Sequence, residues 1–158
     1  MQQRINLMEK GGAAVSAMLG LNGSLAKTSL KKNLLHLVEF RVSQINGCAY
    51  CLDMHSKDLR AAGDTEQRLY LVAAWRESPV YTERERAAFL WTESLTRLGE
   101  GGENVPDAVY ESVKAQFGEQ ELIDLTLAVI AINGWNRLNI AFRTEAGSYQ
   151  PGKWQNAN

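Results

Sequence analysis

Apolar residues recur at intervals of three and four along almost the whole chain, and this spacing constrains the fold more than any other feature. Such spacing gives a helix one apolar face, whereas a half-buried strand needs strict alternation over several residues. Because no segment alternates for long enough to predict a strand, we expect an all-α fold. With 158 residues, the chain is long enough for a single domain over residues 1–158 with its own core.

Local signals divide this periodic pattern into helices. Asn46 and Gly47 tolerate the left-handed conformation that ends a helix, and Gly63 stands at a similar position. Thr82 and Glu85 have the spacing of a capping box, which opens a helix. A flexible loop is predicted over 99–104, and residues 144–158 have no clear pattern. The helices are predicted over about 13–27, 30–46, 48–62, 64–75, 82–98, 106–117, 121–132 and 135–143.

The overall charge and hydropathy of the chain exclude several classes of function. Seventeen basic and eighteen acidic residues give a net charge of -1 and a pI near 6.1, so we expect no binding to nucleic acid or to anionic membrane surfaces. The N-terminus has no apolar segment of the secretory type, and the most apolar stretch, residues 125–132, is too short to span a bilayer. We therefore expect a cytoplasmic protein.

Cys48 and Cys51 are the two cysteines of the chain and have the spacing C-x-x-C. In a reducing compartment such a pair is typical of catalysis or metal binding. Side chains three residues apart on a helix have Cβ atoms roughly 5 to 6 Å apart, so little adjustment brings the two sulfurs to disulfide distance. In the first turn of a helix, unsatisfied N–H groups and the helix dipole favour the thiolate. We therefore predict a redox-active pair.

Three further side chains are candidates for moving protons at this pair. His55 lies four residues after Cys51, so its imidazole is expected on the helix face that carries both sulfurs. His36 and Glu39 lie three residues apart on the preceding helix, and Ser43 continues their face. If that helix folds back, either His36 or Glu39 could complete a relay. The sequence alone leaves the choice between them open.

The same residue types are compatible with two alternatives to redox chemistry. Two buried cysteines can act simply as small apolar side chains. Alternatively, both cysteines and both histidines of the chain fall within residues 36–55 and have the residue types of a zinc site. A straight helix separates Cys48 from His55 by about 10.5 Å of rise, which one zinc ion bridges only if the first turn bends. We therefore predict no metal, although a site of three ligands stays open.

The segment from residue 42 to residue 55 reads VSQINGCAYCLDMH. It resembles the active-site signature of the AhpD-like group within the carboxymuconolactone decarboxylase family. The resemblance continues through residues 65–69, 82–87 and 125–137, and so extends over most of the chain. It implies a single AhpD-like, all-helical domain with the C-x-x-C pair at the start of a helix, in subunits that assemble into trimers or hexamers.

The resemblance also implies a chemistry. It is peroxidase activity without haem, flavin or metal, in which Cys51 attacks a hydroperoxide and Cys48 resolves the sulfenic acid into a disulfide. A sulfenic acid condenses readily with a neighbouring thiol, so the cycle is chemically coherent. His55 matches the histidine that relays the proton. The partner implied is a dithiol reductant, for which the family suggests a lipoyl-bearing protein.

The sequence departs from the family pattern at two positions. The family has a glutamate twelve residues before the first cysteine of the motif, where this chain has His36, and Glu39 is out of register by three. Tyr50 stands between the cysteines where the best-known members have a histidine. Either His36 acts as the relay base, or Glu39 replaces the glutamate, or the pair serves another thiol function.

Three further functions are alternatives to a peroxidase. One is general thiol-disulfide oxidoreduction with the same cysteine pair. A second is the acid-base lactone decarboxylation that names the wider family, which is disfavoured because that branch does not rely on a cysteine pair. The third is a redox-sensing or zinc-stabilised oligomer, which the metal content of the purified protein would reveal.

One short segment occurs twice. Gln44–Cys48 reads QINGC and Ala131–Trp135 reads AINGW, so both place Ile-Asn-Gly between an apolar helix and a following predicted helix. We interpret the pair as a duplicated helix-turn-helix unit in which Trp135 corresponds to Cys48. The alternative is a coincidence between two similar helix junctions.

Overall fold

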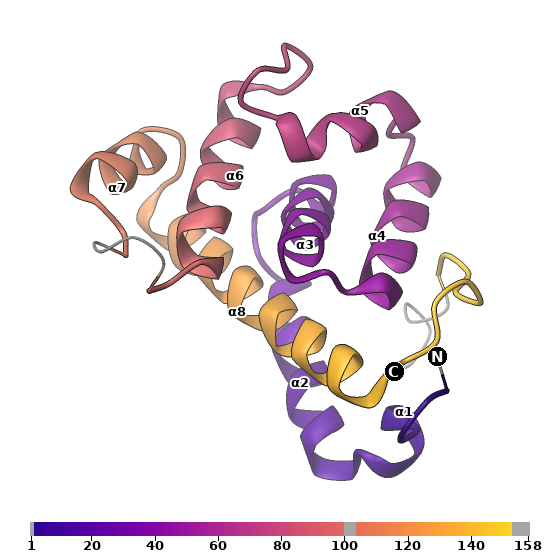
Figure 1. The fold of residues 1–158 in the computed structure, drawn as a ribbon. Helices are drawn as coiled ribbons and strands as arrows, with labels where there is room; N and C mark the ends of the chain where they lie inside the picture. The colour runs from indigo at the N-terminus through magenta and orange to yellow at the C-terminus, as the bar shows by residue number, and fades with distance from the viewer. Residues whose placement is uncertain (1, 100–103, 153–158) are drawn as a thin grey trace.

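A computed structural model describes residues 2–99 and 104–152, which form α-helices and one 3-10 turn, with no strand (Figure 1). The all-α prediction is confirmed. In chain order the elements are α1 (Leu7–Lys10), α2 (Gly12–Leu25), α3 (Lys32–Asn46), α4 (Ala49–Ala61), α5 (Glu66–Leu71), η1 (Val72–Ala74), α6 (Glu83–Thr96), α7 (Asp107–Lys114) and α8 (Glu119–Phe142).

Helix α3 lies at the centre of the molecule, with α4, α5, α6 and α8 around it (Figure 1). Apolar side chains on one of its faces, such as Val38 and Val42, pack against Val129 of α8 in one cluster of buried residues. Leu37 belongs to a second cluster, which includes Leu59 of α4. Because full burial of each such side chain stabilises the fold by about 1.5–3 kcal/mol, the two clusters fix α3 against helices on several sides.

A buried ion pair also connects α3 to α6. The Arg41 guanidinium lies 2.6 Å from the Glu93 carboxylate, and both side chains are almost completely buried. The indole N–H of Trp75 donates to the same carboxylate oxygen at 2.9 Å, and Arg76 lies 2.6 Å from the other oxygen. A buried carboxylate needs such partners, because without them its desolvation is not offset.

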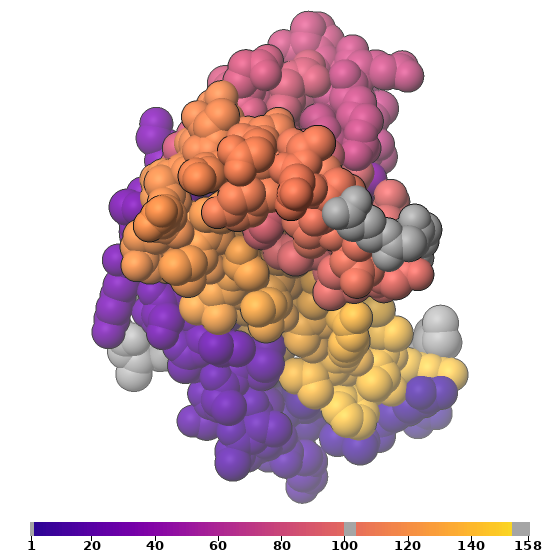
Figure 2. Space-filling model, turned by 90° about the vertical axis from the view of Figure 1, so that its left-hand side faces the viewer, coloured from indigo at the N-terminus to yellow at the C-terminus, as the bar shows by residue number. Residues whose placement is uncertain are grey.

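The remaining helices cover this central group. Helix α7 contacts α6 and α8, and α2 runs against α8 (Figure 1). On the face drawn in Figure 2, α7 and the first half of α8 form the middle of the surface, and α2 lies below them. None of the helices formed by the described residues combines the length and the apolarity needed to cross a bilayer.

Most of the predicted helix boundaries agree with the structure to within a few residues. The predicted capping box is present, because the Thr82 hydroxyl accepts from the N–H of Glu85 and the Glu85 carboxylate accepts from the N–H of Thr82. Thr65 caps α5 in the same way through the N–H of Arg68. Gly47 adopts φ 68° and ends α3 in the predicted left-handed conformation. The loop predicted over 99–104 falls mainly outside the described residues.

Two predictions near helix starts need correction. The first predicted helix, 13–27, is shorter, and a separate helix, α1, precedes it. The Asn6 side chain accepts from the N–H of Glu9 and so opens α1, a local cap that long apolar periodicity does not reveal. Pro106 does not lie in the first turn of α7 but stands immediately before it.

The prediction of separate helices over 121–132 and 135–143 is wrong. Helix α8 runs through Asn133 and Gly134 without interruption. The Asn133 amide donates to the Val129 carbonyl one turn back, so this side chain does not stop the helix. At Gly134 a Cβ atom would lie 2.9 Å from the methyl carbon of Met18 on α2, so the glycine permits close packing of two helices.

The second Ile-Asn-Gly segment is therefore not a helix junction, and the interpretation as a duplicated helix-turn-helix unit is wrong. The two segments nevertheless meet in space. The Asn46 amide donates hydrogen bonds of 2.9 Å to the side-chain oxygens of both Asn133 and Asn136. These bonds attach the end of α3 to the middle of α8.

The segment after α8, for which no pattern was predicted, packs against α4. Tyr149 is buried, and its hydroxyl donates to Asp58 at 2.9 Å. The Lys57 ammonium donates to the carbonyl oxygens of Gly147 and Tyr149, each at 3.0 Å. A chain segment without helical periodicity is thus held in place by side chains of the helix that carries the second cysteine.

The left-handed conformation of Gly47 at the end of α3 leads to a prediction about the free energy of unfolding. Replacing Gly47 by Ala should lower the free energy of unfolding by about 1 to 2 kcal/mol, because an L-residue with a Cβ is strained at φ 68°. Gly20 is the matched control, since it is exposed within α2 and has open space around it. Replacing Gly20 by Ala should raise stability by about 0.5 to 1 kcal/mol. Urea titration measures both values, and equal changes in the two variants would contradict this assignment.

Candidate active site

Cys48 and Cys51 are joined in a disulfide whose Cα atoms lie 5.4 Å apart. The left-handed Gly47 turns the chain sharply, so Cys48 becomes the N-cap of α4 and Cys51 lies in its first turn. The N–H of Cys48 donates to the carbonyl of Ser43 at 3.1 Å, which closes the junction between α3 and α4. Both cysteines are buried, with exposed fractions of 1% and 0%.

The sulfur of Cys48 occupies the place of a capping side chain. It accepts from the N–H of Cys51 at 3.4 Å, as a Ser or Asp oxygen does at other helix starts. The positive end of the helix dipole lies at the same point. When the disulfide is reduced, both influences favour the thiolate form.

His55, one helical turn after Cys51 on α4, comes together with Glu39 and His36 of α3. Nδ1 of His36 and Nδ1 of His55 approach the same Glu39 oxygen, at 3.0 Å and 3.3 Å. His55 is buried on α4, whereas Glu39 and His36 are partly exposed on α3. The sequence left open whether His36 or Glu39 faces His55, and in the structure both belong to one cluster, with the carboxylate between the rings. The Ser43 hydroxyl is directed elsewhere and donates to the backbone carbonyl of Glu39.

Burial and mutual contact set the charges in this cluster. Burial by itself raises the pKa of the Glu39 carboxyl, but the facing imidazoles of His55 and His36 outweigh it and hold that pKa below its ordinary value. Burial also lowers the pKa of His55 below 6.5, although the charge of Glu39 opposes the change. At neutral pH the cluster therefore contains an ionised carboxylate beside a neutral imidazole that can accept a proton.

The ring of His55 also has unused hydrogen-bonding capacity. Neither nitrogen of this buried ring has an aligned hydrogen-bond partner among the described residues, although Nδ1 lies near Glu39. Donor atoms of His36, Glu39 and His55 lie within 4.8 Å of one another, so among residues 2–99 and 104–152 this set could hold a divalent cation. In the four-ligand zinc site considered from the sequence, Cys48 and Cys51 would both be thiolates, whereas here they are bonded to each other.

Two asparagines of α8, neither of them predicted from the sequence, lie near the cysteines. The Asn139 amide nitrogen lies 3.5 Å from the sulfur of Cys51. The Asn136 amide donates to the Ser43 hydroxyl at 3.1 Å and so contacts the α3–α4 junction. Both asparagines are buried in a helix of largely apolar composition, where a buried amide needs hydrogen-bond partners.

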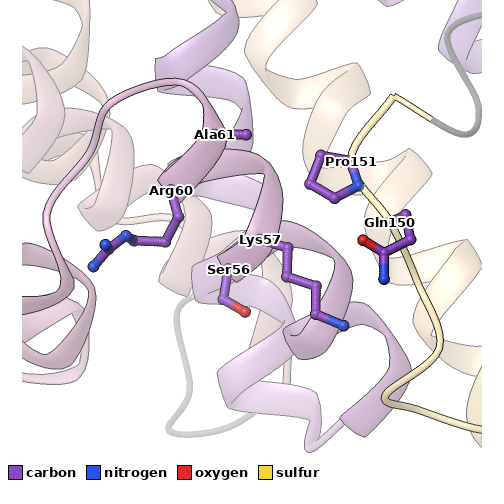
Figure 3. Close-up of a pocket in the computed structure, with 6 residues that line it drawn as sticks. All are labelled: Ser56, Lys57, Arg60, Ala61, Gln150 and Pro151. Carbon is purple, nitrogen blue, oxygen red and sulfur yellow. The ribbon is translucent and has the colours of Figure 1, made fainter.

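A separate depression lies between α4 and the segment after α8, and it is lined by Ser56, Lys57, Arg60 and Ala61 of α4 and by Gln150 and Pro151 (Figure 3). Its volume is about 440 Å³, and it is open to solvent. Lys57 extends toward the C-terminal segment in this view (Figure 3). Because neither cysteine lines it, the depression is distinct from the disulfide site.

Known proteins resemble this chain over most of its length. Protein YdfG of Bacillus subtilis, which is uncharacterised, is 36% identical over 148 residues, which make up 94% of this chain and 99% of that one. The uncharacterised protein YnjA of Escherichia coli is 30% identical over 105 residues, covering 66% of this chain and 56% of that one.

Solved structures share the fold. A protein of unknown function from Agrobacterium tumefaciens, ATU0492, for which an identity as the antioxidant defence protein AhpD has been suggested, superposes with a TM-score of 0.88 at 39% identity, over 94% of this chain and 100% of that one. The debrominase Bmp8 has the same fold at 18% identity, with a TM-score of 0.77 over 89% of this chain and 75% of that one.

A family match agrees with these similarities. Residues 13–94, which include both cysteines and the His55 cluster, match the carboxymuconolactone decarboxylase family. The all-helical fold and the C-x-x-C pair expected from the resemblance are present in the structure. The chain therefore belongs to the carboxymuconolactone decarboxylase family and has an AhpD-like fold.

Proposed function

We propose that this protein is a thiol-dependent peroxidase that reduces hydroperoxides through a Cys48–Cys51 disulfide cycle. The observation that carries the proposal is the disulfide at the start of α4, together with the contact of His55, one turn further along the same helix, with Glu39, which also contacts His36. A peroxidase of this kind needs one thiolate to attack, a second thiol to resolve, and a group that moves a proton. The site contains a candidate for each.

The reaction begins with the Cys51 thiolate. Its sulfur attacks the terminal oxygen of the hydroperoxide, the O–O bond breaks, and the leaving alkoxide takes a proton to become an alcohol. Cys51 is then a sulfenic acid. The Cys48 thiolate attacks that sulfur and expels hydroxide, which takes a proton and leaves as water. Two thiols and one hydroperoxide thus give one disulfide, one alcohol and one water.

His55 supplies the proton transfers in this proposal. As a neutral imidazole it accepts the proton of the Cys51 thiol, and as an imidazolium it donates that proton to the leaving alkoxide. Glu39, at 3.3 Å, stabilises the imidazolium, and His36 forms the outer end of the cluster, closer to solvent. On this proposal Glu39 replaces the family glutamate, and His36 extends the relay toward the surface.

The oxidised enzyme returns to its dithiol form by exchange with a dithiol reductant, for which we propose a lipoyl-bearing protein in the cytoplasm. We also propose that the protein is a homo-oligomer, a trimer or a hexamer. Three exposed isoleucines of α8, namely Ile123, Ile130 and Ile140, support an apolar interface, because 44–63% of each residue is exposed in the single chain.

Substitution of each cysteine should separate the two thiol roles. We expect Cys51→Ser to abolish peroxide consumption. Cys48→Ser should still allow one attack, after which Cys51 proceeds to sulfinic acid because no resolving thiol is present. Stopped-flow mixing of the reduced proteins with hydrogen peroxide and an organic hydroperoxide measures the attack, and mass spectrometry of the products identifies the oxidised cysteine.

The control is the parent protein with both thiols alkylated. Peroxide consumption at the parental rate by Cys51→Ser, or by the alkylated protein, would contradict the proposal. Lactone decarboxylation by the alkylated protein would instead favour the acid-base chemistry of the wider family.

The proton relay makes a separate prediction about the titration of His55. In the parent protein the pKa of His55 should lie below 6.5, because burial disfavours the imidazolium. Glu39→Gln should lower the pKa of His55 further, since the negative charge that favours the imidazolium is removed. NMR detection of the ring C–H signals against pH measures this pKa, and a His36→Gln variant assigns the signals of the two histidines.

An exposed carboxylate provides the control for the same titration. Glu9→Gln, on α1, should leave the pKa of His55 unchanged. If Glu39→Gln left the His55 titration unchanged as well, the carboxylate would not be coupled to the ring, and the relay would be wrong.

A further inference from the structure

The two sulfurs of the disulfide receive hydrogen bonds from different donors. Cys48, as the N-cap, accepts from the backbone N–H of Cys51 at 3.4 Å. Cys51 has a donor of another kind, the side-chain amide of Asn139 on α8, whose nitrogen lies 3.5 Å from its sulfur. A helix start alone therefore favours the thiolate of Cys48, whereas the donor from α8 acts on Cys51.

We propose that the Asn139 amide stabilises the Cys51 thiolate and thereby makes Cys51, rather than Cys48, the attacking sulfur. The inference rests on the proposed role of Cys51 in the peroxidase cycle. It adds a residue of α8, more than eighty positions along the chain from the C-x-x-C motif, to the groups that set the reactivity of the pair.

The amide is held in position for this role. Its nitrogen carries two hydrogens, and it also donates to the Trp135 carbonyl one turn back on α8, at 3.0 Å. Asn139 is buried, with 7% of its surface exposed. One N–H is therefore fixed by the helix itself, and the other is directed at the sulfur in a place with little competing water.

The Asn139 amide stabilises an anionic Cys51 sulfur more than an uncharged one. A disulfide or a neutral thiol is a weak acceptor, whereas a thiolate is an anion, and hydrogen bonds to charged groups are the stronger kind. Cys51 is fully buried, and burial alone disfavours the thiolate. The titratable groups of the histidine–glutamate cluster are His55 on α4, with Glu39 and His36 on α3. The contact that α8 makes with the Cys51 sulfur comes from an uncharged amide.

The test measures the acidity of each sulfur in a protein that contains one thiol. Cys51 is titrated in Cys48→Ser and Cys48 in Cys51→Ser, each with and without Asn139→Leu, by the ultraviolet absorbance of the thiolate and the rate of iodoacetamide alkylation. Leucine keeps the approximate shape of asparagine and removes the donor. We expect Asn139→Leu to raise the pKa of Cys51 by about one unit, which is tenfold less thiolate below the pKa, and to change Cys48 much less.

Two further variants keep the test decisive. Asn139→Asp is closest in shape and places a carboxylate at the sulfur, so it should raise the pKa of Cys51 more than leucine does. Asn136→Ala removes a buried amide of the same helix that contacts Ser43 and Asn46 but no sulfur, so it should destabilise the fold without changing the pKa of Cys51. Thermal unfolding followed by circular dichroism shows which variants are folded at the temperature of the titration.

The outcomes are distinct. An unchanged pKa of Cys51 in folded Asn139→Leu or Asn139→Asp, or an equal rise in Asn136→Ala, overturns the inference. Because no peroxide enters these titrations, they test Asn139 independently of the peroxidase proposal. A shifted pKa in a protein that does not reduce peroxide would support the role of Asn139 and refute the proposed function alone.

Discussion

The hydrogen bonds that the Asn46 amide donates to Asn133 and Asn136 hold the end of α3 against α8. Asn46 is the last residue of α3, and the turn at Gly47 follows immediately, so the place where α3 meets α8 also determines where α4 begins. From this junction α4 runs beside α3 and brings His55 to Glu39. The two cysteines are therefore positioned by a polar contact between helices, whereas the apolar clusters hold the helices to one another.

Features that depend on nearby residues could be predicted from the sequence. The capping box at Thr82, the left-handed Gly47 and the shared face of Cys51 and His55 all follow from local spacing, and the structure has the first two as predicted. The continuity of α8 could not be predicted, because an Asn-Gly pair ends one helix and not the other. Gly134 stays helical where α2 packs against it, and this contact joins residues far apart in the sequence.

The same distinction applies to the site. The cysteine pair and His55 are recognisable within one segment, but the meeting of His36, Glu39 and His55 depends on how α3 and α4 pack. A displacement of three residues along α3 keeps a side chain near the same helix face, so Glu39 faces His55 although it lies out of register with the family glutamate. Asn139 could be identified only from the fold, since nothing near it in the sequence indicates a sulfur.

Complete burial of the disulfide has a consequence for its surroundings in a cell. Neither cysteine offers more than 1% of its surface to solvent, so the S–S bond is closed to direct collision with a small thiol in this conformation. Thiol exchange at this bond requires local opening of the structure around the two cysteines. A partner that binds the opened form supplies free energy for that opening. On the proposed function, a reductant would therefore have to bind before it reacts, and the redox state of the pair would follow that binding more closely than the bulk thiol pool.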